Sequence, residues 1–144
     1  MLITPPGLSS ATLATLRSCG RGEKECVVWW VGPADAPNEV DEIVHPSHIG
    51  QVGYYEVESA WLHAFWVELG RSRRSIRVQV HTHGIDGFHS TTDDLGAVVQ
   101  VPGFLSLVLP RFAMDDDCLD HAFLAELDHQ GRFIEVPVTS RIVF

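Results

Sequence analysis

The alternation of hydrophobic and polar positions predicts strands and helices in turn along the chain. Residues 25–31 are almost entirely apolar and end at Gly32-Pro33, which is typical of a buried strand closed by a turn. In residues 59–69 the apolar side chains recur at helical spacing, and Gly70 follows them. This second segment is therefore expected to be an amphipathic helix with an aromatic stripe facing the core.

Residues 76–83 alternate between apolar and polar side chains. Because successive side chains of a strand point to opposite faces, this pattern predicts a strand with Ile76, Val78 and Val80 on one face. His81 and His83 are then neighbours on the other face.

The remaining elements are weaker. A short helix through Leu13 and Leu16 is expected to be capped by Ser9 or Ser10 and to end near Gly20. Residues 34–55 predict one or two weak strands and residues 90–94 a helix or turn start, and the acidic segment that contains His121 and His129 is expected to be weakly helical. Further strands are expected at residues 97–101 and 104–109, as a hairpin, and at 133–136 and 142–144, as edge strands of the same sheet.

This order of elements predicts an α/β fold in which a mixed β-sheet is flanked by helices. The chain has 144 residues, 45% of them hydrophobic, which is enough for one domain spanning residues 1–144 to bury a core of its own.

The charge balance argues against nucleic acid as a partner. Ten Lys and Arg residues against 19 Asp and Glu give a formal net charge of −9, and the only basic cluster is Arg71, Arg73 and Arg74. No apolar run has the roughly 18 residues that a membrane span needs, and the N-terminus has no pattern of a secretory signal. We therefore expect a cytoplasmic protein that binds neither nucleic acid nor membrane.

The three cysteines are interpreted as reduced thiols. Cys19, Cys26 and Cys118 are an odd number with no Cys-x-x-Cys spacing, which does not suggest a disulfide framework. Cys26 lies in an apolar run, where a thiol is usually an inert core residue.

Potential metal ligands are concentrated in residues 81–94, which contain three histidines and three aspartates. Two imidazoles at positions i and i+2 of a strand can share one ion, and a loop that folds back can add a carboxylate. His81, His83 and Asp93 would leave one tetrahedral position open, which marks a catalytic rather than a structural zinc site. A general base is also needed, and Glu25 is either that base or a solvated residue before the strand.

A second group of histidines offers a competing metal site. His45 and His48 are three residues apart, but they lie in a proline-containing loop with no acidic or thiol ligand near them in the sequence. His89 lies beside the main cluster. We expect His45 and His48 to be solvated surface residues.

The residues Glu25, His81-Thr82-His83 and Ser90-Thr91-Thr92-Asp93 resemble the JAMM family, also called the MPN+ metalloproteases. The resemblance covers roughly residues 8–112 and implies the JAMM/MPN fold, which is like that of cytidine deaminases. It implies that His81, His83 and Asp93 bind one Zn²⁺ per chain. It further implies that Glu25 is the general base and that the Ser90 hydroxyl stabilises the oxyanion.

Two departures from the family pattern concern the loop after the histidines. Gly84 stands where the family usually has proline, and the loop from His83 to Ser90 is one residue shorter than the commonest spacing. Thr91 with Asp94 is the alternative register. We favour Ser90 with Asp93 because this register keeps the serine.

The resemblance implies a zinc-dependent peptidase or isopeptidase that cleaves a ubiquitin-like protein after its C-terminal glycine. Stand-alone domains of this kind resemble bacterial or archaeal members, which are often paired with ubiquitin-like activating and conjugating enzymes. Two alternatives use the same residues. One is a protease that matures a sulfur-carrier protein, and the other is a metal-binding scaffold for a ubiquitin-like partner without turnover.

Overall fold

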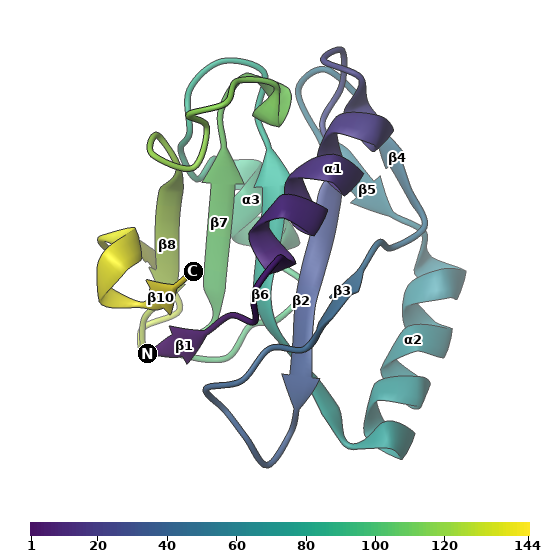
Figure 1. Cartoon of the computed structure of the whole chain (residues 1–144). Helices are drawn as coiled ribbons and strands as arrows, with labels where there is room; N and C mark the ends of the chain where they lie inside the picture. The colour runs from purple at the N-terminus through teal and green to yellow at the C-terminus, as the bar shows by residue number, and fades with distance from the viewer.

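A six-stranded mixed sheet forms the centre of the computed structural model, which describes all residues 1–144 (Figure 1). Its strands are β2 (Val27–Pro33), β3 (Glu42–Val44), β6 (Arg74–Thr82), β7 (Leu105–Leu109), β8 (Phe123–Leu127) and β9 (Phe133–Glu135). Their order is β3-β2-β6-β7-β8-β9, and only the β6–β7 pair is parallel. The predicted α/β architecture is confirmed.

Helices cover both faces of the sheet, and β2 shows why. The helices are α1 (Leu8–Gly20), α2 (Ser59–Ser72) and α3 (Thr91–Gly96). Val28 and Trp30 of β2 belong to the core beneath α1, which lies in front of the sheet in Figure 1. Trp29 points the other way and packs against Trp61 and Phe65 of α2. Both faces of the strand are therefore buried, as its continuous apolar sequence predicts.

Helix boundaries differ from the prediction at two ends. Helix α1 begins at Leu8 with Gly7 as its N-cap, in the left-handed conformation that glycine adopts most easily. Ser9 and Ser10 consequently lie inside the helix and do not cap it. Helix α2 continues past Gly70 to Ser72, whose hydroxyl donates to the carbonyl of Glu68.

Two short sheets lie outside the main one. Strand β1 (Leu2–Ile3) pairs in parallel with β10 (Ile142–Val143), and β4 (His48–Gly50) pairs with β5 (Tyr55–Val57). The prediction that residues 142–144 extend the main sheet was wrong, because the backbone of this segment forms its hydrogen bonds with the N-terminal strand instead.

Two predictions for the second half of the chain were also wrong. Residues 97–101 form no strand, since β7 already has β6 and β8 on its two edges and the Val98 amide donates instead to the side chain of Gln79, 3.2 Å away. The expected weakly helical segment contains β8, whose Leu124, Ala125 and Leu127 are buried. Packing against β7 outweighs the local pattern there.

The cysteine interpretation requires a correction. Cys19 at the end of α1 and Cys26 just before β2 form a disulfide, and only Cys118 is free and buried. The fold brings the two sulfurs together because the turn between α1 and β2 reverses the chain over seven residues. Because Cys19 and Cys26 are not reduced thiols, the cysteines no longer support the expectation of a cytoplasmic location.

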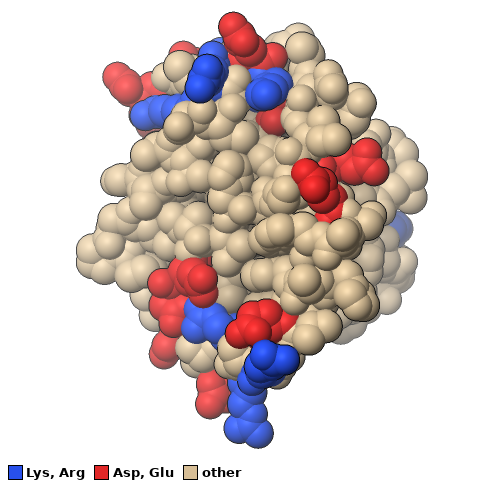
Figure 2. Space-filling view, turned by 90° about the vertical axis from the view of Figure 1, so that its right-hand side faces the viewer, with Lys and Arg blue, Asp and Glu red and all other residues tan.

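The surface seen from the α2 side has few charges at its centre. Figure 2 shows Lys, Arg, Asp and Glu side chains mainly towards the upper and lower ends of this face, with some acidic side chains right of the middle and an uncharged area on the left and in the centre. Trp66 and Val67 of α2 are exposed. None of the helices is long and apolar enough to traverse a bilayer.

Candidate metal centre

Three side chains meet at the end of β6 beside α3. His81 is the penultimate residue of β6, His83 directly follows the strand, and Asp93 is in the first turn of α3. Asp93 Oδ1 lies 3.2 Å from His81 Nε2, and Asp93 Oδ2 lies 3.1 Å from His83 Nε2. One ligand atom from each residue lies within 4.8 Å of the others, and all three residues are buried. The sequence-predicted ligands are thus brought together.

Asp93 is oriented by the start of α3. The Ser90 hydroxyl accepts from the Asp93 amide at 3.1 Å, and Asp93 Oδ2 accepts from the Ser90 amide at 2.8 Å. This reciprocal pair is a capping box, which satisfies two amides that the helix leaves unpaired. The Ser90 hydroxyl proton has no acceptor within the protein and is free to be donated.

The backbone of His83 is held by a left-handed turn across the sheet. Its amide donates to the carbonyl of Leu109, and its carbonyl accepts from the amide of Phe112. Arg111, Phe112 and Ala113 all have positive φ angles, of 48°, 55° and 58°. Such a run is costly for residues with a Cβ, so the surrounding contacts must enforce it.

This turn also explains the glycine that departs from the family pattern. A Cβ on Gly84 would lie 2.9 Å from the Phe112 ring, closer than a carbon contact allows. The Phe112 ring occupies the space that a larger residue would need, so a side chain at position 84 would have to displace this ring.

Glu25 is buried, with 4% of its surface exposed, and lies just before β2. Its amide donates to the carbonyl of Gln51, and its carbonyl faces Gly50 so closely that a Cβ there would be 2.2 Å away. The next residue, Cys26, exchanges hydrogen bonds with Thr82 of β6. The β4–β5 hairpin and β6 together position Glu25, whose carboxyl group has no hydrogen-bond partner in the protein.

The pKa values show that Glu25 belongs to the same electrostatic site. Burial raises the pKa of Glu25 to about 7, the charge of His83 lowers it and the charge of Asp93 raises it further. Burial also disfavours the carboxylate of Asp93. The close contacts of Asp93 with the His81 and His83 rings nevertheless outweigh burial and hold the pKa of Asp93 well below its usual range.

The two imidazoles respond differently to the same carboxylate. Burial dominates at His81 and lowers its pKa, which favours the neutral ring. At His83 burial acts in the same direction, but the hydrogen bond and charge of Asp93 outweigh it and raise the pKa. A neutral imidazole is the form that binds a metal.

The donor set fits a divalent cation. His81 is fully buried, and neither of its ring nitrogens has a hydrogen-bond partner, although Nε2 lies 3.2 Å from Asp93 Oδ1. Unpaired buried nitrogens are costly unless a further group binds them. Two imidazoles and one carboxylate are a ligand set of catalytic zinc sites that retain an open position.

The alternative register places its residues elsewhere. Asp94 pairs with His89, 2.6 Å away, and its side chain is about half exposed. His89 in turn packs its ring against Phe133. Asp93, and not Asp94, is therefore the carboxylate beside His81 and His83.

A second cluster was missed by the sequence analysis. Cys19 and Cys26 lie next to His45 and His48, and the four ligand atoms are within 4.8 Å of one another. The prediction that no thiol ligand lies near these histidines was wrong, because the β3–β4 loop folds over the end of α1. The spacings Cys-x₆-Cys and His-x₂-His were the available signal.

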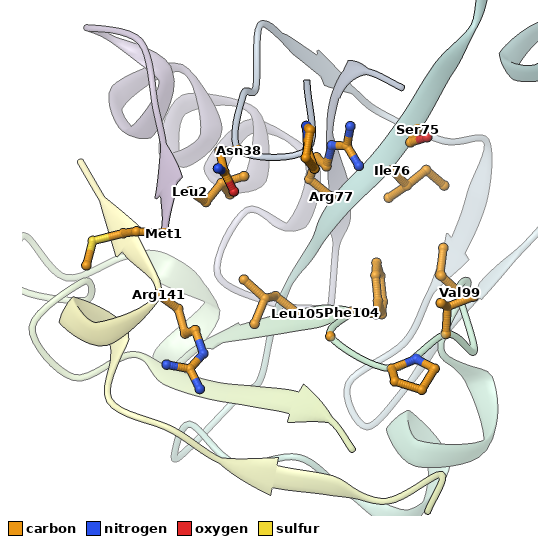
Figure 3. A pocket seen from close by; sticks show the side chains of 14 residues that line it. Met1, Leu2, Asn38, Ser75, Ile76, Arg77, Val99, Phe104, Leu105 and Arg141 are labelled. Atoms are coloured by element: carbon orange, nitrogen blue, oxygen red, sulfur yellow. The ribbon is translucent and has the colours of Figure 1, made fainter. Parts of the chain in front are cut away.

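Two cavities differ in their relation to the metal centre. A cleft of about 220 Å³ reaches Asp93 and is bordered by β5, by Leu62 of α2 and by Gly96. A larger cavity of about 470 Å³ lies at the opposite end of β6 (Figure 3). The two arginines in the larger cavity are already partnered, Arg77 by the Pro33 and Ala36 carbonyls and Arg141 by Glu126. The smaller cleft is consequently the one that serves the candidate site.

Comparison with known proteins gives one sequence relative and several structural ones. No protein-family model matches the chain. The chain is 34% identical over 138 residues to the probable metalloprotease y4jG of Sinorhizobium fredii, covering 92% of this chain and 85% of that protein.

Two solved structures share the fold. The solution structure of protein DSY2949 from Desulfitobacterium hafniense matches with a TM-score of 0.66 and 12% identity, covering 99% of this chain and 92% of that one. The crystal structure of AF2198, a JAB1/MPN domain protein from Archaeoglobus fulgidus, matches with a TM-score of 0.55 and 14% identity over the full length of both chains.

Proposed function

The chain belongs to the JAMM/MPN metalloprotease family, and we propose that it uses zinc to hydrolyse the bond that follows the C-terminal glycine of a ubiquitin-like protein. The family makes it a metal-dependent peptidase. The observation that carries the finer proposal is the convergence of His81, His83 and Asp93 at one point, with the buried Glu25 in their electrostatic field.

The proposed chemistry divides between the cation and the side chains. A Zn²⁺ ion held by His81, His83 and Asp93 would polarise the scissile carbonyl and acidify the attacking water. Glu25 accepts the proton of that water and passes it to the leaving amine, which its raised pKa favours. The free hydroxyl proton of Ser90 is donated to the oxyanion that develops on the carbonyl oxygen.

The cleft beside Asp93 supports an extended chain with small residues as the substrate. It is narrow, about 220 Å³, and Gly53 and Gly96 contribute to its walls, so backbone can approach backbone there. Apolar side chains are exposed on the two segments that border the centre, namely Ile49, Val52 and Tyr54 on one and Ile85, Phe88 and Leu95 on the other. Such exposed apolar groups suit the docking of a folded protein.

Cleavage assays test the substrate. We expect the zinc-loaded protein to cleave a folded ubiquitin-like protein after its terminal Gly-Gly, from a lysine side chain or a linear extension, and to spare a variant ending in Ala-Ala. Cleavage of a free peptide with the same terminal residues at the same rate would exclude recognition of the folded domain. Tight binding without cleavage would instead favour the scaffold alternative.

The Ser90 hydroxyl has a dual role that substitutions can separate. Ser90→Ala is expected to lower kcat by about 10²- to 10³-fold, because an oxyanion donor is lost. Ser90→Asp restores a helix cap but no donor, and should remain slow with the metal bound. Ser90→Thr keeps both functions. Thr91→Ala serves as the control, and a larger loss there than in Ser90→Ala would favour the Thr91/Asp94 register.

The pH dependence should follow the ionisation of Glu25. The base acts as the carboxylate, so kcat/KM is expected to rise about tenfold per pH unit below its pKa and to level off above it. Burial sets that pKa at about 7 without a cation, and a bound cation favours the carboxylate, so the midpoint lies at or below 7. The profile is measured with constant metal content, and an activity independent of pH below this midpoint would contradict the assignment.

A further inference from the structure

The cluster of Cys19, Cys26, His45 and His48 has the composition of a structural metal site. Its residues come from three segments: the end of α1, the residue just before β2, and the segment that runs from the β3–β4 loop to the first residue of β4. All four ligand atoms lie within 4.8 Å of one another, in a group separate from the catalytic cluster. Two sulfurs and two imidazole nitrogens are the ligand set of tetrahedral structural zinc sites.

The distances between sulfur and nitrogen match those of a metal site. Cys19 Sγ lies 3.5 Å from His48 Nε2, and Cys26 Sγ lies 3.5 Å from His45 Nε2. Zinc–sulfur and zinc–nitrogen bonds of about 2.3 and 2.05 Å at a tetrahedral angle give a sulfur–nitrogen separation of about 3.5 Å. Two edges of the tetrahedron are therefore already in place.

The orientation of His48 is that of a metal ligand. Its Nδ1 lies 2.9 Å from the carbonyl of Pro46, which can only accept, so Nδ1 carries the proton. Nε2 then presents a lone pair towards Cys19 Sγ, and a disulfide sulfur has no proton to offer it. A histidine whose second nitrogen is bound to a backbone carbonyl is the arrangement that metal sites use to orient the ring.

We propose that Cys19, Cys26, His45 and His48 bind a second Zn²⁺ ion when the two cysteines are reduced. A dithiol reductant supplies two electrons and two protons, its own thiols become a disulfide, and the Cys19–Cys26 bond becomes two thiols. Zinc then binds the two sulfurs as thiolates, both thiol protons are released to solvent, and the ion remains Zn²⁺. The two thiolates balance the charge of the ion, so the site adds no net charge to its partly buried surroundings.

The surroundings of the cluster leave it open to solvent and place it between segments that it could hold together. An open hollow of about 420 Å³ is lined by Cys19, His45 and His48, so a metal can enter from solvent. Cys26 directly follows Glu25, and β4 begins at His48. Zinc would thus hold the end of α1, the residue after Glu25 and the start of β4 together, whereas the disulfide joins only the first two of these segments.

Metal counting on the full chain tests the proposal. After reduction with a phosphine, which does not itself chelate zinc, the wild type should hold about two zinc ions per chain, and about one when oxidised. Replacing zinc by Co²⁺ should give thiolate-to-cobalt charge-transfer absorption only in the reduced protein. A ligand set of two histidines and one aspartate cannot produce that absorption, so this readout is independent of the catalytic proposal.

Matched variants separate the two sites. Cys19→Ser combined with Cys26→Ser should hold about one ion in either redox state. Asp93→Asn should keep the thiolate–cobalt absorption, and Cys118→Ser should behave as wild type. A second measurement does not depend on folding of the double variant. The extent of alkylation of Cys19 and Cys26 is compared in the reduced wild type with and without zinc, and zinc should protect both cysteines. Equal alkylation of Cys19 and Cys26 in both samples, with no charge-transfer band, would overturn the proposal.

Discussion

Glu25→Gln is expected to retain the catalytic metal and lose hydrolysis by about 10²- to 10⁴-fold in kcat, the contribution of a positioned general base. The amide is of nearly the same size as the carboxyl group and is not needed as a ligand. The backbone contacts of residue 25 with Gln51 and Gly50 do not involve its side chain, so the local structure should persist. Steady-state kinetics and metal analysis on the same preparation measure both effects.

The matched control is Glu23→Gln. Glu23 lies two residues earlier and is exposed, so it carries the same change of charge without access to the site. It should leave kcat unchanged. Wild-type activity in Glu25→Gln would remove Glu25 from the mechanism, whereas loss of metal together with activity would make it a structural residue.

Asp93→Asn is expected to remove both catalytic metal binding and detectable activity. Asp93 contacts both imidazoles with its two oxygens, and its hydrogen bond with His83 together with its negative charge raises the pKa of His83 above its usual value. An amide supplies neither the charge nor a second acceptor oxygen. Zinc titration by calorimetry, followed by the cleavage assay in saturating zinc, measures the two losses separately.

Asp94→Asn provides the comparison for this variant. It makes the same chemical change one residue further on, at a side chain that is about half exposed and pairs with His89. Normal zinc affinity in Asp94→Asn is expected. The reverse result, with Asp93→Asn active and Asp94→Asn inactive, would require the Thr91/Asp94 register.

Much of the metal centre could be predicted because its signal is local. Two-residue periodicity places His81 and His83 on one face of a strand, and β6 has this geometry. The association of Asp93 with them came from the family resemblance and not from periodicity. The position of Glu25 depends on hydrogen bonds with Gln51 and on the close approach of Gly50, which no local pattern reveals.

The features that escaped prediction depend on contacts distant in sequence. Cys19 and His48 are 29 residues apart, and the spacings Cys-x₆-Cys and His-x₂-His match no familiar metal-site motif. Residues 97–101 have the composition of a strand, but both edges of β7 were already occupied. In each case the outcome depended on which segments pack side by side, and this information is spread over the whole chain.

The capping box makes Asp93 a member of two structures at once. Helix α3 has only six residues, too few to be stable in isolation, and its first turn is held by the same carboxylate that faces His81 and His83. Unwinding of α3 would swing this carboxylate away from the imidazoles. A polypeptide that stabilised α3 from the cleft at Gly96 would therefore also raise the affinity for the cation, and by linkage the cation would raise the affinity for that polypeptide.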